Sequence, residues 1–534
     1  MGLPAVPRRT YLYPVHVRES HLFFLLCLLS ASLLIVPPVY LCGDGPSHLY
    51  NARVLFDAAL GRGRDFYETF FHINRHIDPN WLSHLALGTL IQVMPALWAD
   101  KVLQLIYLGG FACGFRYLVR GVNSDNGFLA FLFFPLAFTQ PFQQGFYNYC
   151  LALALMCWTL GFFLRNLNNF MTEPLKQFML ALLLLATTFA HGMPALYTLA
   201  LIGVLWLLHQ RKTISLSRVG LQAPAVLALI ALPSAFVIGL FVLRRGSATV
   251  PHAWSLWTKF TQFLKGWTSQ CIRADEVYPA TAFMLLCGVL LLYALIRFRR
   301  NFTLAAWGFL GLAAFTFIAY LRCPHSVGGA GSLDIRLAYL PPLFTLVALA
   351  ALPWHAALKH TVKVSGFMLA AAFLLIRFPA AMQSAQIVQD IRKASAFIPK
   401  HSVVLNLDAD AWADSLMQRD GSFLHAGDLL GTEKDKPVIL LMNYEAEIDY
   451  FPVNWMPGMN PRQSIEGLIP GTYPPCGDPL AYERQSGRRI DRLTITNPKS
   501  YAQPCYHALR DSIQRHFEPV YANASVEVYR RRAN

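Results

Sequence analysis

The sequence predicts an α-helical polytopic membrane bundle of about eleven transmembrane helices, followed by a C-terminal extracytoplasmic α/β domain. Only 14% of its 534 residues are charged and 55% are hydrophobic, whereas a soluble globular chain carries about a quarter charged residues. Apolar runs of about 17–25 residues, the length that crosses a hydrocarbon core of about 30 Å, recur along the first 380 residues. Because backbone polar groups in lipid must be satisfied within a segment, we expect these runs to be helices.

The basic residues support a membrane location and argue against binding to nucleic acid. The formal net charge is +15, but the lysines and arginines stand in short clusters between the apolar runs and form no basic stripe with interleaved aromatic residues. Cytoplasmic loops of membrane proteins retain positive charge in this way. The clusters are Arg8–Arg9, Arg211–Lys212, Arg297–Arg299–Arg300 and Lys359–Lys363.

The apolar segments decide how many times the chain crosses the membrane. They lie at 21–41, 81–97, 101–118, 127–140, 149–165, 177–190, 194–209, 222–243, 278–297, 302–321, 336–353 and 362–378. The first is long and lacks a small-residue cleavage site, so we interpret it as a span with the amino terminus inside. If 81–97 lies on the membrane surface, the basic loops 118–126 and 165–176 stay inside and the uncharged loop 141–148 stays outside. Eleven crossings therefore fit better than twelve, with a long first external loop at 42–100 and the tail outside.

The chain changes character after residue 380, where the apolar spans stop and charge rises. Short strand-like runs alternate there with helical stretches, which predicts a small α/β domain. We therefore divide the chain into a transmembrane module at 1–380 and an extracytoplasmic, periplasmic domain at 381–534. Cys476 and Cys505 of this domain could form a disulfide on the outer side. The strand-like runs are Ser402 to Leu407, Pro437 to Met442, Arg489 to Ile495 and Ala524 to Tyr529, and the helical stretches are 383–397 and 502–516.

The first external loop opens with a carboxylate at the membrane exit of the first span. Asp44 is partly desolvated there, so it could act as a general base on an acceptor hydroxyl or amine, or help to hold a cation. His48 follows four residues later and can share a helical face with Asp44, and Asn51 and Arg53 come next. The alternative is that Asp44 only caps the helix that begins in this Gly-Pro turn.

Two further external stretches carry polar side chains that suit a binding site. In the segment Asp-Pro-Asn-Trp-Leu-Ser-His, Asn80 and His84 could face a ligand, unless Trp81 only anchors the segment at the membrane interface. The loop that follows the third span holds Gln144 and Asn148 among aromatic residues. Such a set suits hydrogen bonds to sugar hydroxyls with ring stacking, and a plain helix–helix turn explains it equally well.

The loop before the tenth span ends in an arginine that enters the membrane segment. A guanidinium at this point would pair bidentately with a phosphate, which makes Arg336 a candidate, and His325 and Asp334 could orient it. The alternative is a flexible loop with one snorkelling arginine. No Walker motif, GxSxG, HExxH or dinucleotide fingerprint occurs, which disfavours an ATP-driven pump and a serine hydrolase of the common type.

Taken together, this layout resembles the GT-C superfamily of membrane glycosyltransferases, which includes protein O-mannosyltransferases and the aminoarabinose transferases of lipid A. The segment Gly-Asp-Gly-Pro-Ser-His around Asp44 looks like the family's first external loop, and Asp78 to His84 looks like its approach to a juxtamembrane helix. Leu333-Asp-Ile-Arg looks like its late arginine-bearing span. Phe517-Glu-Pro-Val-Tyr and Val528-Tyr-Arg-Arg are similar to the last strands of its periplasmic domains.

The resemblance implies transfer of a sugar, with inversion, from a polyprenyl-phosphate-linked donor to a lipid, glycan or protein acceptor on the outer side of a bacterial inner membrane. It implies that Asp44 is the catalytic base or acceptor orienter and that Arg336 clamps the donor phosphate, with His48, Asn148 and His325 as further polar contacts. Many family members have an acidic pair in the first loop, where Gly follows the acid here, and a second acid where this chain has amides. The requirement for a divalent cation therefore stays open, and no metal ligand is assigned.

Two other classes of protein are compatible with the sequence. A transporter or lipid flippase would be expected to show pseudo-symmetric halves or matching broken spans, and the sequence shows neither. A non-catalytic scaffold of an envelope assembly is consistent with every residue named above.

Overall fold

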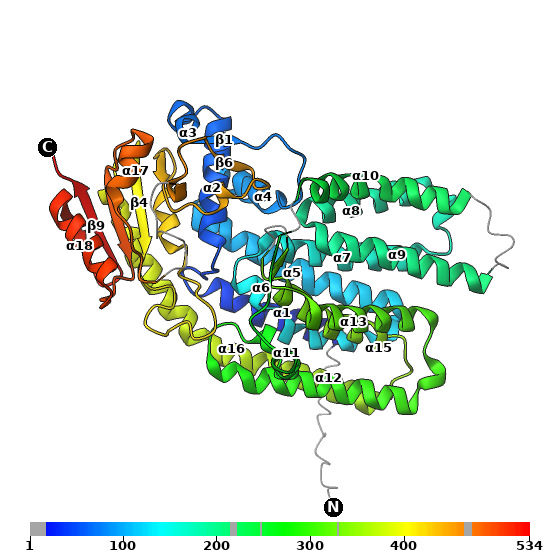
Figure 1. Cartoon of the computed structure of the whole chain (residues 1–534). Coiled ribbons are helices and arrows are strands. Elements are labelled where there is room, and N and C mark those ends of the chain that lie inside the picture. Colours follow the sequence, from blue (N-terminus) through cyan, green and yellow to red (C-terminus); the bar gives the residue numbers. More distant parts are fainter. Residues whose placement is uncertain (1–17, 214–221, 246–247, 328–330, 464–472, 534) are drawn as a thin grey trace, which may run out of the picture.

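Long helices run side by side in a bundle, and a mixed sheet with its own helices packs against one end of it (Figure 1). In the computed structural model, the described residues are 18–213, 222–245, 248–327, 331–463 and 473–533. The predicted basic pair Arg8–Arg9 lies outside these ranges.

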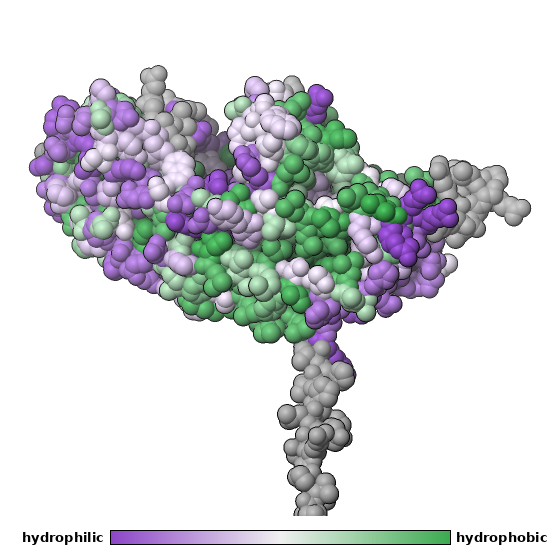
Figure 2. All heavy atoms as spheres, turned by 90° about the horizontal axis from the view of Figure 1, so that it is seen from below, coloured by the Kyte–Doolittle hydropathy of each residue, from purple (hydrophilic) through white to green (hydrophobic). Residues whose placement is uncertain are grey.

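Seven helices of the described residues are long and apolar enough to cross a membrane. Apolar residues cover the middle of the molecule in Figure 2, while hydrophilic residues cover the tail end on the left and gather again at the opposite end. An exposed apolar belt of this kind indicates that lipid, not water, surrounds the middle of the bundle. The chain is therefore an integral, multi-pass membrane protein. The seven helices are α5 (Ala96–Val122), α7 (Tyr147–Asn166), α9 (Gly192–Thr213), α10 (Gln222–Arg244), α12 (Val277–Arg297), α13 (Leu304–Arg322) and α16 (Ala356–Lys393).

The other predicted spans coincide with shorter or broken helices, so the number of eleven crossings stays a prediction. Pro135 lies inside η1, and prolines at the start of α15 separate it from α14, because proline lacks the N–H that a continuing helix needs. The elements concerned are α1 (Glu19–Ile35), η1 (Ser124–Leu136), α8 (Pro174–Ala190), α14 (Leu333–Ala338) and α15 (Leu340–Leu349). The 12-residue helix α4 (Leu82–Val93) is only about 18 Å long, which is shorter than a hydrocarbon core of about 30 Å. Its place on the membrane surface stays a prediction.

The first external loop folds into α2 (Gly45–Ala59), α3 (Arg64–Phe70), the strand β1 (Phe71–Ile73) and α4. Helix α2 begins directly after Asp44, with Pro46 in its first turn, where the fixed φ of proline suits a helix start. Thirteen of its 15 residues are buried, whereas a surface helix buries only one stripe. Helix α2 is enclosed because α4 packs against it and the tail turn η8 (Ala426–Gly431) also contacts it.

The tail forms a five-stranded sheet in the order β5-β4-β7-β9-β8. Strand β4 pairs in parallel with both β5 and β7, and β9 pairs antiparallel with β7 and β8. All but the last residue of β4 are buried, as expected of a central strand covered on both faces. The strands are β4 (Ser402–Asp408), β5 (Val438–Leu440), β7 (Arg492–Thr496), β8 (Phe517–Ala522) and β9 (Val526–Arg531), with the helices α17 (Pro479–Ser486) and α18 (Pro504–His516).

Several short elements complete the structure. Two-stranded pairs join β1 to β6 and β2 to β3. The remaining elements are α6 (Gln140–Gln143), α11 (Leu256–Leu264), β2 (Thr249–Val250), β3 (Ser326–Val327), β6 (Val453–Trp455), η2 (Phe170–Thr172), η4 (Trp267–Ser269), η5 (Ala274–Glu276), η6 (Arg299–Asn301), η7 (Ala394–Phe397), η9 (Glu445–Glu447) and η10 (Pro461–Gln463).

The tail and the membrane module are joined at several places. Helix α16 runs without interruption through the predicted boundary at residue 380. Strand β1 of the first loop pairs with β6 of the tail, so that Phe71 lies opposite Trp455. Asn51 of α2 and Asn443 of the tail exchange two side-chain hydrogen bonds of 2.9 Å each, and both side chains are fully buried. Our division into a module at 1–380 and a domain at 381–534 stays a prediction, because these contacts cross it.

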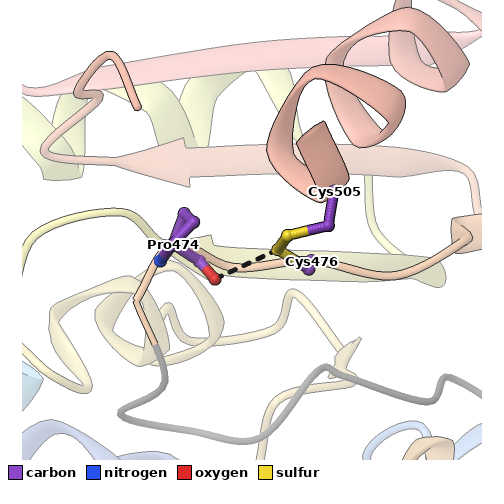
Figure 3. The surroundings of a disulfide bond; sticks show 3 residues. All are labelled: Pro474, Cys476 and Cys505. Carbon is purple, nitrogen blue, oxygen red and sulfur yellow. Dashed lines mark hydrogen bonds between the residues drawn. A yellow bond between two sulfur atoms is a disulfide. The ribbon is translucent and has the colours of Figure 1, made fainter. Parts of the chain in front are cut away.

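A disulfide lies at the edge of the tail, between Cys476 and Cys505 (Figure 3). It links the loop before α17 to the first turn of α18. The sequence analysis left this pairing open, and the structure contains it.

The buried amide pair between α2 and the tail predicts a measurable coupling. Asn51→Ala leaves the Asn443 amide buried without its partner, and such a group costs about 1–3 kcal/mol. The double variant Asn51→Ala/Asn443→Ala removes both amides, so it should be less destabilised than the sum of the two single variants. Thermal unfolding of the detergent-purified protein measures the three differences.

A control for this cycle is Asn301→Ala, in an exposed turn at the end of the bundle away from the tail, which should change stability by less than about 0.5 kcal/mol. Strictly additive effects of the two buried substitutions would contradict the coupling.

Candidate functional site

A cavity of about 680 Å³ lies where the helix bundle meets the tail. Its walls come from the start of α2, the start of α7, the helices α9, α10 and α14, and the tail loop that contains η9. Five of the residues predicted from the sequence line this one cavity: Asp44, His48, Asn80, Asn148 and Arg336. The remaining predicted residues lie elsewhere, as described below.

Asp44 is held in place by two loops that pack backbone against backbone. The Gly43 and Asp44 N–H groups donate to the carbonyl oxygens of Gln143 and Gln144, each at 2.8 Å. Gly145 makes this approach possible: its φ is +83°, and a Cβ there would lie 2.6 Å from the Asp44 nitrogen. Any larger residue would push the two loops apart. The loop after the third predicted span therefore fixes the position of Asp44.

Asp44 is the N-cap residue of α2, but its carboxyl makes no capping hydrogen bond, which argues against a purely capping role. Burial raises its pKa to about 6, although His48, the Tyr444 hydroxyl and Arg336 favour the charged form. At pH 7 the group is therefore mostly ionised and able to accept a proton. The ring of His425 lies 3.6 Å away, and burial lowers the pKa of that histidine to about 3, so it is neutral.

Arg336 presents a guanidinium without a local counter-charge. Its guanidinium lies over the rings of Phe146 at 4.4 Å and Tyr149 at 5.7 Å, and one terminal nitrogen is 3.2 Å from Nε2 of His191. Among the described residues, no carboxylate lies within ion-pair distance of it, and its buried Nε has no hydrogen-bond partner. A cation held by aromatic faces and open to a cavity is suited to bind an anion.

Asn148 joins the second predicted polar loop to the first. Its Oδ1 accepts from the Ser83 N–H and its Nδ2 donates to the Asn80 carbonyl, each at 2.7 Å. Asn80 has a φ of +74°, a left-handed conformation that asparagine tolerates better than most residues. The Asn148 amide therefore uses these two hydrogen bonds to hold the turn before α4, at the wall of the cavity.

His48 and His84 meet a tail residue that the sequence analysis did not single out. Nδ1 of His48 lies 2.6 Å from Oε1 of Glu445, and Nε2 of His84 lies 2.8 Å from its Oε2. Burial alone would raise the pKa of Glu445, but the charges and hydrogen bonds of the two histidines outweigh it and lower the pKa to about 2. Nothing in the spacing of the tail sequence marked Glu445, because its partners are about 360 and 400 residues away in the chain.

The other predicted site residues do not line the cavity. Asn51 is paired with Asn443, and Arg53 lies 3.5 Å from Asp57 in an ion pair one helical turn away. Gln144 is hydrogen-bonded to the tail residue Asp420. The last two, His325 and Asp334, meet each other at 3.5 Å beside the cavity wall formed by the start of α14. Their predicted roles in binding stay predictions.

Comparison with known proteins gives a likeness of fold. No family model and no curated protein matches the sequence. The cryo-EM structure of the arabinofuranosyltransferase AftD from Mycobacteria aligns with 97% of this chain at a TM-score of 0.51 and 13% identity. The chain spans 40% of AftD. A crystal structure of ArnT from Cupriavidus metallidurans bound to undecaprenyl phosphate aligns with 96% of this chain and 97% of its own, at 12% identity and a TM-score of 0.45. At this level of identity, the alignment with AftD shows that the two chains share a fold over the aligned region.

Proposed function

We propose that this protein is a membrane glycosyltransferase that moves a sugar from a polyprenyl-phosphate-linked donor to an acceptor on the outer side of the membrane. One observation carries the proposal: a single cavity holds an ionisable carboxyl, Asp44, and a guanidinium without a counter-charge, Arg336. Transfer of a sugar from a phosphate leaving group uses a base for the acceptor and a cation for the phosphate, and these two groups can supply them.

The cavity has the mixed character that a lipid-linked sugar needs. Leu196 of α9 and Ile238 and Val242 of α10 line it on one side, and Leu196 and Val242 are about half exposed on the apolar surface of the bundle, at 49% and 57%. A polyprenyl chain can lie against this side without losing apolar contact. Its phosphate then reaches Arg336, whose planar fork can bind two phosphate oxygens.

The chemistry follows from the two groups. Asp44 accepts the proton of the acceptor hydroxyl as its oxygen attacks the anomeric carbon of the sugar. The bond from that carbon to the phosphate oxygen breaks, the sugar is transferred with inversion, and polyprenyl phosphate leaves. Arg336 stabilises the negative charge that grows on the leaving phosphate, which lowers the barrier because the guanidinium is already in place. No nucleotide or external energy source takes part in this step.

The tail contributes to the acceptor side of the cavity. Tyr444, Ile448, Tyr450 and Phe451 all line it, and these residues belong to the tail segment that precedes β6. Aromatic rings suit stacking against sugar rings. We assign the selection of the acceptor to this segment.

The distribution of charge supports an outward-facing tail. Arg120, Arg165, Arg297 and Lys359 lie at the ends of α5, α7, α12 and α16 that point away from the tail. Short loops rich in lysine and arginine stay in the cytoplasm. The tail and the cavity then face the periplasm of a bacterial inner membrane.

Removal of the Asp44 charge should slow transfer strongly. In Asp44→Asn the amide cannot accept the proton, so the rate should fall by about 10²–10⁴-fold. Transfer of radiolabelled sugar from a polyprenyl-phosphate donor by the purified protein measures it. Asp65→Asn is the matched control, an exposed aspartate of the same external loop that should leave the rate unchanged. An Asp44→Asn variant with the full rate would exclude Asp44 as the base.

Substitutions of Arg336 should separate charge from geometry. Arg336→Ala loses charge-assisted hydrogen bonds of about 1.5–3 kcal/mol, which corresponds to roughly 10–100-fold in kcat/KM for the donor. Arg336→Lys keeps the charge but lacks the planar guanidinium, so its kcat/KM should lie between those of the wild type and Arg336→Ala. Arg484→Ala, at a side chain 66% exposed in the tail, serves as control. Equal activity of all four proteins would remove Arg336 from the donor site.

Labelling of introduced cysteines tests the sidedness. Gln485→Cys places a thiol on the exposed tail helix α17, and Arg300→Cys places one at the opposite end of the bundle. A membrane-impermeant maleimide added to intact cells should label the first variant and not the second. The described free cysteines are buried or intermediate, so the unsubstituted protein gives the background. A tail thiol that reacts only after the cytoplasmic side is opened would reverse the topology.

A further inference from the structure

Three side chains from distant parts of the chain converge at one buried point beside Asp44. His48 comes from α2, His84 from α4 and Glu445 from the tail turn η9. Their exposed fractions are 3%, 0% and 0%. The donor atoms of the three side chains all lie within 4.8 Å of one another, and His48 also lines the cavity.

A hydrogen bond of His48 determines which of its two ring nitrogens carries the proton. The other nitrogen, which faces the cluster, then has a lone pair. Nε2 of His48 lies 3.0 Å from the carbonyl oxygen of Gly145. A carbonyl only accepts, so Nε2 carries the proton, and the Nδ1 of a neutral ring then has a lone pair. That lone pair faces Nε2 of His84 at 3.3 Å, and Nδ1 also lies 2.6 Å from a carboxylate oxygen of Glu445. Two acceptors at this distance repel unless a positive centre lies between them.

The geometry suits a metal ion as that positive centre. A tetrahedral site with bonds of about 2.0–2.1 Å places its ligand atoms about 3.4 Å apart, and the two ring nitrogens are 3.3 Å apart. The carboxylate oxygens lie closer to the rings, at 2.6 and 2.8 Å, so binding requires the carboxylate to move away by roughly 0.6–0.8 Å. A proton on His48 is the alternative centre, and it would leave an imidazolium paired with Glu445.

We propose that His48, His84 and Glu445 bind a divalent transition-metal ion of the zinc class next to the cavity. Two imidazoles and one carboxylate form the ligand set that zinc prefers when a fourth position is left for water or substrate. Magnesium and calcium prefer oxygen ligands, which makes them poor occupants. Because the ligands come from α2, α4 and η9, the ion would also tie the tail to the first external loop.

A second group of possible ligands lacks these features. His252, His325 and Asp334 also lie close together. However, the Trp254 N–H donates to Nδ1 of His252 at 2.9 Å, so Nε2 of that ring carries a proton and donates to Asp334 at 2.7 Å. This is an ordinary hydrogen bond that needs no cation. The ring of His325 is 47% exposed.

Metal content and spectroscopy test the proposal without any assay of sugar transfer. The full-length protein in detergent is loaded with zinc, freed of excess metal and analysed for zinc per chain. We expect one bound zinc in the wild type, binding at least about tenfold weaker in His84→Gln and in Glu445→Gln, and unchanged binding in His252→Gln. Cobalt in place of zinc should give the visible absorption of a four-coordinate site in the wild type.

Two outcomes reject the site. The first is a wild type that retains no zinc after loading and whose unfolding temperature does not rise with zinc. Such a protein contains the imidazolium pair instead. Zinc lost from His252→Gln but kept by His84→Gln places the ion in the other group. The wild-type measurements hold even if a variant fails to fold. A wild type that transfers sugar but binds no zinc would reject only the metal site, and zinc binding by a protein that transfers nothing would reject only the proposed function.

Discussion

The burial of α2 between the membrane bundle and the tail is the constraint on which the rest of the structure depends. A helix buried on every side must find partners for its polar groups, because each unsatisfied one costs about 1–3 kcal/mol. Asn51 finds Asn443, His48 finds Glu445, and the Tyr50 hydroxyl donates to the Val438 carbonyl at 3.0 Å. All three partners belong to the tail. The tail is therefore required to complete the first external loop, and the cavity exists only where the two meet.

Asp44 and Arg336 have different electrostatic surroundings within the cavity. Asp44 is close enough to Arg336 and His48 for both to favour its charged form, yet burial still holds its pKa near 6. Arg336 is surrounded by rings rather than by carboxylates. A full ion pair between the two would neutralise the proposed base and occupy the proposed phosphate site. Asp44 precedes α2 and Arg336 lies in α14, so the two groups reach the cavity from different elements.

The features that the sequence predicts are those with a local signal. Long apolar runs predicted the helices that are long enough to cross, and short strand-like runs predicted four strands of the tail sheet near their observed bounds. Asp44 and Arg336 could be found because a charged residue at a membrane boundary is costly and therefore conspicuous. Glu445 and His425 could not, because they lie in a polar segment where charge is ordinary and their partners are hundreds of residues away. Hydropathy counts every apolar segment as a crossing, including the segments that the prolines at Pro135 and before α15 divide into shorter helices. The number of predicted crossings is therefore larger than the number of long helices in the described residues.

The uninterrupted helix α16 has a consequence for traffic through the cavity. Its 38 residues span about 57 Å, and they connect the bundle directly to the first strand of the tail sheet. With β1 paired to β6 as a second attachment, the tail is fixed to the bundle at two places. Under the proposed function, a lipid-linked donor would enter sideways, by diffusion within the bilayer, between the exposed apolar side chains of α9 and α10. Turnover in such a protein would depend on the fluidity and the lipid composition of the membrane as much as on the chemistry in the cavity.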